Sequence, residues 1–169
     1  MEPAAIFERL QQRFGNKVPE VSLKLPGAFA VIEPKALLEI CRYFYSEPDL
    51  AMDCLSNQTG VDRKDCVEVV YHLCSYSLRH EAVLKVRLPR ANPVISTVEE
   101  IWKSANWMER EIFDLLGVIF EGHSDMRRIL MPEDWPGFPL RKDFVEPAEY
   151  HGISTVRESP ILRLDDKRK

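Results

Sequence analysis

The stretch Asn106–Leu130, "NWMEREIFDLLGVIFEGHSDMRRIL", marks the point at which the regular periodicity of this chain ends. Its apolar residues follow helical spacing as far as Leu116. Gly117 can close that helix in a left-handed conformation. Beyond Gly117 the spacing fades, and ionisable residues crowd among apolar ones. Such crowding indicates either catalysis or a charged interface within a protein assembly.

Upstream of this stretch, hydrophobic patterning predicts a helix–sheet domain. Helical spacing occurs at 5–14 and at 34–45, where Pro34 suits a first helical residue. The predicted strands are 21–25, 28–33, 50–55, 67–76 and 82–88. Pro26-Gly27 predicts a hairpin turn after the first strand, and 57–60 a turn after the third. The order α-ββ-α-βββ predicts an α+β fold, a two-layer domain with helices on one face of a mixed, largely antiparallel sheet.

The second part of the chain changes character around the helix in the opening stretch. Ser96 or Thr97 precedes two glutamates and can head a capping box, so we expect the helix to begin near there. We assign residues 1–121 to the α+β domain, including this helix. The later segment "MPEDWPGFPLRKDFVEP" holds four prolines and one glycine in 17 residues, which excludes a long helix or a central strand. We therefore expect 122–169 to form an extended arm that docks on a partner.

Composition excludes several classes of protein. The chain has 169 residues, enough for one domain plus an appendage, and 45% of them are hydrophobic. The net charge of −4 argues against a free-standing nucleic-acid binder. No apolar run reaches the roughly 18 residues of a membrane span. The cysteines form no CxxC pair, so neither zinc nor an iron–sulfur cluster is indicated, and we expect reduced thiols. They are Cys41, Cys54, Cys66 and Cys74.

The charged residues of the helix favour an interface. Glu109 lies at the edge of the apolar stripe, where a buried carboxylate needs a guanidinium or several N–H donors. Arg110 and Asp114 are spaced as an i,i+4 surface pair. Glu111 lies on another side, so one helix offers charges in three directions. A helix placed between its own domain and another protein explains this distribution.

The arm carries mixed charge with aromatic residues, which suits protein docking. His123 and Asp125 form only a weak metal signal, and we interpret the histidine as structural. The basic residues alternate with acidic ones, so the local field is mixed. The candidate interface residues are Glu109, Arg110, Glu111, Asp114, His123, Asp125, Arg127, Arg128, Trp135, Arg141, Lys142 and Asp143.

An enzymatic interpretation remains open at this point. Glu109 or Glu111 would act with His123 as acid and base in a stand-alone enzyme. Against it, the sequence has no nucleophile with an adjacent base, no glycine-rich phosphate loop and no metal-ligand cluster. A third alternative is a small α+β binding module.

The segment "EREIFDLLGVIFEGHSDMRRIL" resembles the signature of the 30-kDa subunit family of respiratory complex I, which in bacteria is the subunit labelled C of NADH-quinone oxidoreductase. The segments "IWKSANW", "EDWPGFPLRKDF" and "VEVVYHL" are also similar to that family. The similarity spans most of Val67–Phe144. This chain has Ser124 where the family usually has proline, and Phe144-Val145 where Tyr-Pro is common.

The resemblance implies a non-redox structural subunit in the peripheral arm of a proton-translocating NADH:quinone oxidoreductase. Such a subunit has no catalytic, cofactor-binding or metal residues of its own, because FMN, iron–sulfur clusters and quinone belong to partner subunits. It is expected to dock on the 49-kDa-type subunit, labelled D in bacteria, and on neighbouring quinone-module subunits. Its expected place is the cytoplasmic face of the bacterial inner membrane, without a span. The alternative within this framework is the equivalent subunit of a membrane-bound hydrogenase or ferredoxin-fed relative.

Overall fold

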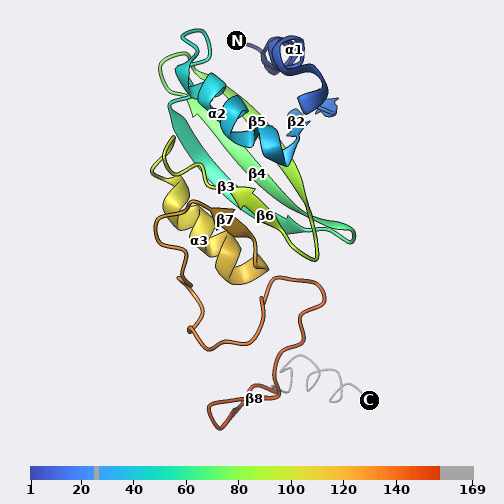
Figure 1. Cartoon of the computed structure of the whole chain (residues 1–169), viewed down its shortest axis with the longest axis vertical. Helices are drawn as coiled ribbons and strands as arrows, with labels where there is room; N and C mark the ends of the chain where they lie inside the picture. Colours follow the sequence, from blue (N-terminus) through green and yellow to red (C-terminus); the bar gives the residue numbers. More distant parts are fainter. Residues whose placement is uncertain (25–26, 157–169) are drawn as a thin grey trace, which may run out of the picture.

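The computed structural model describes residues 1–24 and 27–156. A five-stranded sheet of order β1-β2-β5-β4-β3 forms its centre, with helices packed against it (Figure 1). The helices are α1 (Pro3–Phe14), α2 (Leu37–Ser46) and α3 (Ala105–Leu116), with 3-10 turns η1 (Gly15–Lys17) and η2 (Pro34–Ala36). The sheet strands are β1 (Glu20–Ser22), β2 (Phe29–Ile32), β3 (Cys54–Asp62), β4 (Cys66–Ser75) and β5 (His80–Pro89). Two small sheets add β6 (Val94–Ser96) with β7 (Ile119–Glu121), and β8 (Glu149–Tyr150) with β9 (Ile153–Ser154).

The sheet is mixed and largely antiparallel, as the sequence predicts. β4 pairs antiparallel with β5 along its whole length, from Cys66 opposite Pro89 to Ser75 opposite His80. β2 runs parallel to β5, with Ile32 opposite Val86. The predicted hairpin of β1 and β2 is confirmed, although Pro26 of its turn lies outside the described residues.

The helices cover the apolar face of the sheet. Alternate residues of β4 and β5 point into one core with the buried sides of α1 and α2. α3 packs on β3 at Gly60, where a Cβ atom would lie 2.3 Å from Leu116 Cδ1. A glycine at this position therefore lets the helix approach the strand closely. This contact sets the position of α3 and of the chain that follows it.

The prediction for the third strand is wrong in its bounds. β3 occupies 54–62, and the polar residues 57–60 that predict a turn lie inside it. Asn57 and Thr59 are exposed while Gln58 is buried, the alternation of a strand. Pairing with β4 supplies hydrogen bonds that local turn preference does not offer, so tertiary context decides. The turn comes earlier, at Ala51, whose φ is +41°.

The predicted capping box at the start of the third helix is also wrong. α3 begins at Ala105, because Ser96 belongs to β6 and pairs with Glu121 of β7. The Thr97 hydroxyl accepts a hydrogen bond from the Glu99 N–H at 3.1 Å, in a local turn rather than a helix cap. The end of the helix is as predicted: Gly117 has φ +71° and ψ 28°, and its N–H donates to Phe113 O.

Residues 122–156 extend from the domain with little regular structure beyond the β8–β9 pair (Figure 1). This agrees with the predicted local turns, and the boundary at 121 stays a prediction. None of the helices among the described residues is long and apolar enough to cross a membrane.

Candidate functional site: a clamped junction between helix and arm

Asp114 fastens the arm to α3. Its side chain is fully buried, and Oδ2 accepts the three consecutive backbone N–H groups of residues 129–131 at 3.0, 2.7 and 2.8 Å. Arg128 Nη1 donates to Oδ1 at 2.8 Å. Three aligned N–H groups and a guanidinium form a cradle for one negative charge. We call residues 128–131 together with Asp114 the junction.

The junction holds the carboxylate in its charged form. Burial alone would raise the pKa of Asp114, but the N–H groups of Met131 and Leu130, with Arg128, outweigh it and lower the pKa. Arg128 extends the clamp along the arm, because Nη2 donates to the carbonyls of Trp135 and Gly137 at 3.0 Å each. Asp114 and Arg128 together thus hold residues 128–137, a segment without regular secondary structure, against α3.

Glu109 is a second fully buried carboxylate, on the domain side of α3. Its carboxylate accepts hydrogen bonds from the Thr97 hydroxyl, from the Val98 N–H at 2.9 Å and from the Gln58 side-chain amide at 3.4 Å. The predicted need for N–H donors is therefore met, and none of the donors among the described residues is a guanidinium. Burial raises the pKa of Glu109 and outweighs these hydrogen bonds. Glu109 thus joins α3 to β3 and to the segment before α3.

Glu109→Gln is expected to remove a specific pH dependence of stability. When folding raises the pKa of a carboxyl group, the group's contribution to stability is fully present below its pKa in the unfolded chain, about 4.3. That contribution is lost as the pH rises through the pKa in the folded chain. The free energy of unfolding of the wild type minus that of the variant should therefore fall over that pH interval. Urea titrations of both proteins at a series of pH values measure this. A difference that stays flat, or that rises with pH, would contradict the assignment.

Glu99 and His123 tie the start of the arm to the start of α3. Glu99 accepts the Ser124 N–H at 2.8 Å and the Asn106 amide at 2.7 Å. The His123 ring is fully enclosed, with Nε2 3.0 Å from the Asn106 carbonyl and Nδ1 accepting the Asp125 N–H at 2.9 Å. These partners assign the tautomer with hydrogen on Nε2. His123 is thus a structural residue, as its sequence context indicates.

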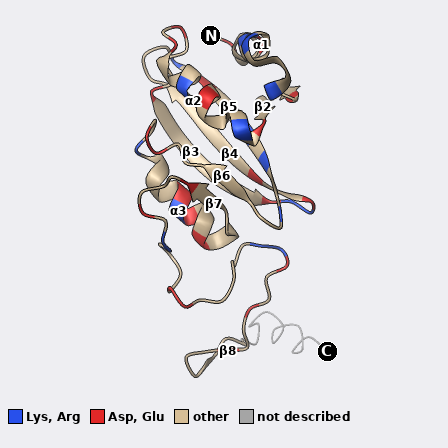
Figure 2. Ribbon diagram, in the orientation of Figure 1, with Lys and Arg blue, Asp and Glu red and all other residues tan. Residues whose placement is uncertain are grey.

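The predicted i,i+4 pair of Arg110 and Asp114 does not form. Arg110 instead reaches the arm, where it donates to the carbonyls of Arg127 and Arg128 at 3.1 and 3.2 Å and faces Asp125 at 3.5 Å. Asp114 is already surrounded by the arm, so both partners gain more hydrogen bonds across the junction than along the helix. Figure 2 shows the alternating charges on α3 and the chain beside it.

Further along the arm, Arg141 closes the end of α3. Its Nε donates to Leu116 O at 2.6 Å, which satisfies a terminal helix carbonyl with a cation. Phe138 lies under Arg141 and packs against Gly117, where a Cβ atom would come 2.5 Å from its ring. The Lys142 N–H donates to Asp62 Oδ2 at 2.7 Å, at the end of β3. This part of the arm therefore contacts its own domain.

The remaining candidates are dispersed. Asp143 pairs with Arg90 at 2.6 Å, and Arg127 pairs with Asp125 at the surface. The Trp135 ring lies against Tyr150, with ring centroids 4.9 Å apart and ring planes 57° apart. Glu111 is exposed. Sequence reasoning did not assign Gln58, Thr97, Glu99 or Asp62 to this site. It placed Gln58 in a turn, gave Thr97 and the glutamates after it only a role in helix capping, and had no local signal for Asp62.

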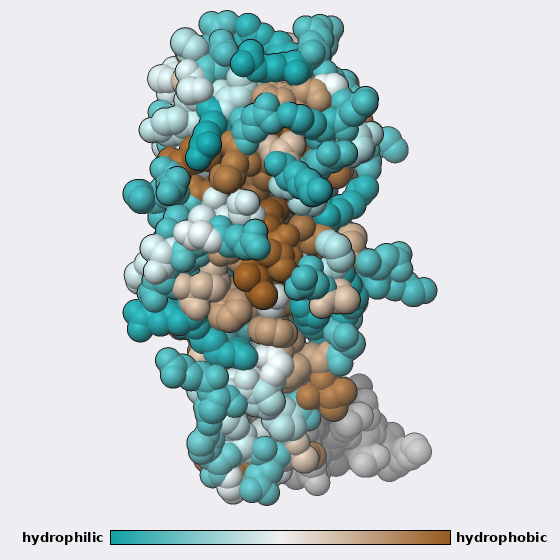
Figure 3. All heavy atoms as spheres, viewed as in Figure 1, coloured by the Kyte–Doolittle hydropathy of each residue, from teal (hydrophilic) through white to brown (hydrophobic). Residues whose placement is uncertain are grey.

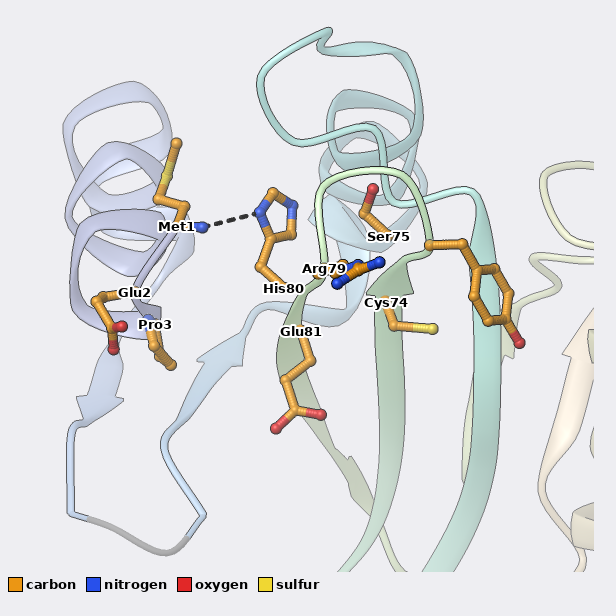
Figure 4. A pocket seen from close by; sticks show the side chains of 9 residues that line it. Met1, Glu2, Pro3, Cys74, Ser75, Arg79, His80 and Glu81 are labelled. Carbon is orange, nitrogen blue, oxygen red and sulfur yellow. Dashed lines mark hydrogen bonds between the residues drawn. The ribbon is translucent and has the colours of Figure 1, made fainter.

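The acid–base interpretation gains no support from this geometry. Both ring nitrogens of His123 are engaged by backbone groups, and Glu109 is enclosed by its own donors. Among residues 1–24 and 27–156, no three His, Cys, Asp or Glu side chains gather to hold a metal ion. A pocket of about 570 Å³ lies between α1 and the β4–β5 turn, lined by residues that include Met1 and His80 (Figure 4). It includes none of the candidate residues.

Comparison with known proteins decides the family. The family model described as "Respiratory-chain NADH dehydrogenase, 30 Kd subunit" matches residues 30–150. The chain belongs to this family. The subunit labelled C of NADH-quinone oxidoreductase from Roseiflexus castenholzii is 44% identical over 121 residues, 70% of either chain. The same subunit of Roseiflexus sp. strain RS-1 is 39% identical over 153 residues, covering 88% of this chain and 87% of the relative.

Solved structures have the fold of this 30-kDa family member. "Nqo5 of the trypsin-resistant fragment (1-134)" superposes with a TM-score of 0.61 at 24% identity and covers 71% of this chain and 98% of that one. A chain of the membrane-bound sulfane sulfur reductase, an archaeal respiratory membrane complex, gives 0.67 at 24% identity, covering 84% and 85%. The α+β fold expected from the sequence is therefore confirmed.

Proposed function

We propose that this chain is a non-redox structural subunit of a proton-translocating NADH:quinone oxidoreductase. It would dock on the 49-kDa-type subunit and its quinone-module neighbours, at the cytoplasmic face of the bacterial inner membrane. FMN, iron–sulfur clusters and quinone would lie in those partners. Family membership supports the assignment, as does a site whose polar groups serve hydrogen bonds within the chain.

The observation that carries the docking proposal is the arm's uncovered apolar surface. The junction and Arg141 fix the backbone, yet Leu130 is 62% exposed, Leu140 59% and Val145 85%. Apolar side chains on a fixed path are typical of a surface that a partner covers, because ordering costs have already been met. On the face drawn in Figure 3, apolar residues gather in the middle, between hydrophilic residues on either side. Further apolar residues are exposed lower down, along the arm.

Leu140→Asp is expected to weaken capture of the 49-kDa-type subunit without unfolding the chain. The Leu140 N–H still donates to Leu115 O, so the backbone contact remains, while a charge replaces an apolar anchor. Loss of one anchor costs about 2 kcal/mol, roughly thirtyfold in affinity. Co-purification with the 49-kDa-type subunit, with thermal unfolding of the free variant, measures both effects.

Leu78→Asp is the matched control. Leu78 is 42% exposed and lies in the turn between β4 and β5, so the same chemical change is made away from the arm. We expect it to keep full capture. Equal loss in both variants, or no loss in Leu140→Asp, would show that the arm does not carry the interface.

A further inference from the structure

Two of the four cysteines face each other across neighbouring strands. Cys54 of β3 lies directly opposite Cys74 of β4. Their neighbours Leu55 and Leu73 are buried in the core, so strand alternation places both thiols on the opposite face of the sheet. Both cysteines are half-buried, and Cys54 is near enough to raise the pKa of the Cys74 thiol. In Figure 4 the Cys74 sulfur points from β4 toward β3.

The backbone spacing fits a bridge between these thiols. Residues directly opposite in an antiparallel pair have Cα atoms about 4.5–5.5 Å apart. Disulfides span Cα separations of about 4.4–6.8 Å, so the strands need little movement. The other cysteines differ: Cys66 lies opposite Pro89, and Cys41 is buried in α2.

We propose that Cys54 and Cys74 form a dithiol site that a low-molecular-weight disulfide oxidises to a bridge between β3 and β4. One thiolate attacks the small disulfide, breaks its S–S bond and releases one small thiol. The second cysteine then attacks the resulting mixed disulfide, forms the protein S–S bond and releases the other small thiol. The protein loses two hydrogens and two electrons, and both pass to the two released thiols.

The surroundings set the conditions for this reaction. Burial and the adjacent Cys54 raise the pKa of the Cys74 thiol, with Asp53 adding to the effect. Thiolate is the reacting form, so exchange should be followed at a mildly alkaline pH of about 8.5. The bridge would pin β3 beside the register shift between Leu55 and Asn57. Closing this loop should raise the unfolding temperature by roughly 5–10 °C.

The experiment treats the intact chain with glutathione disulfide and maps the products by mass spectrometry without reduction. Wild type is expected to give a peptide pair linked through Cys54 and Cys74, with little glutathione retained at either residue. Cys54→Ser removes one thiol of the pair, so any reaction at Cys74 should stop at the mixed disulfide with glutathione. Cys66→Ser is the matched control and should form the bridge as wild type does.

Two results would overturn the proposal. One is stable glutathione adducts on both Cys54 and Cys74 in wild type, which would show that the thiols do not meet. The other is absence of reaction at both residues in the folded chain while the urea-unfolded chain reacts. Cys74→Ala, which should leave Cys54 as a glutathione adduct, repeats the trapping test if Cys54→Ser unfolds.

Discussion

Asp114→Ala is expected to lower the free energy of unfolding by roughly 3–5 kcal/mol, because it leaves Arg128 without its carboxylate and three N–H groups without an acceptor. Residues 129–131 should then exchange their amide hydrogens much faster. Urea unfolding and hydrogen exchange measure the two effects. Glu111→Ala, an exposed change on the same helix, should alter neither.

The contribution of Asp114 to the free energy of unfolding should depend on pH with the opposite sign to that of Glu109. A carboxyl whose folded pKa is lowered contributes stability that is present above its unfolded value, about 3.9, and lost as pH falls through the folded value. The stability difference between wild type and Asp114→Ala should therefore shrink in that acid range. An undiminished difference there would show that the aspartate charge does not hold the junction.

Removing the residues after Met131 is expected to abolish partner capture while leaving the α+β domain folded. The core cluster and the side chains packed on it end at Met126, so the deletion takes no core residue. It removes the exposed Leu140 and Val145 and the contacts of Phe138 and Arg141. Loss of these two anchors, at about 2 kcal/mol each, corresponds to roughly a thousandfold in affinity. Circular dichroism and a pull-down with the 49-kDa-type subunit test the two halves of this expectation.

Limited proteolysis of the full chain is the companion measurement. The arm is held on its domain as far as the pair of Arg90 and Asp143, so protease should cut the free chain between 144 and 156 and spare that segment in the assembled complex. If the shortened chain binds the 49-kDa-type subunit at full strength, or if assembly leaves cutting between 144 and 156 unchanged, the docking proposal fails.

The sequence by itself determined the elements whose period is strong. The enrichment of 67–76 and 82–88 in Val, Tyr and Leu predicts the central strand pair, because these residues favour strands. Gly117 predicts the end of α3, since its left-handed conformation is a local property. The composition of the arm predicts the absence of long regular elements there. The signature motif indicates the family, which the comparisons confirm.

Tertiary structure alone decided the remainder. Polar residues 57–60 form a strand because β4 is beside them, and α3 starts at Ala105 because β7 takes Ser96. The partners of the candidate charges also lie far away in sequence: Asp114 binds residues 14 to 17 positions on, and Glu109 binds Gln58, 51 positions back. Helical spacing shows only which residues share one side of a helix. A buried carboxylate takes whichever donors the fold brings to it, because desolvation makes an unpaired charge too costly, and that choice depends on packing between distant segments.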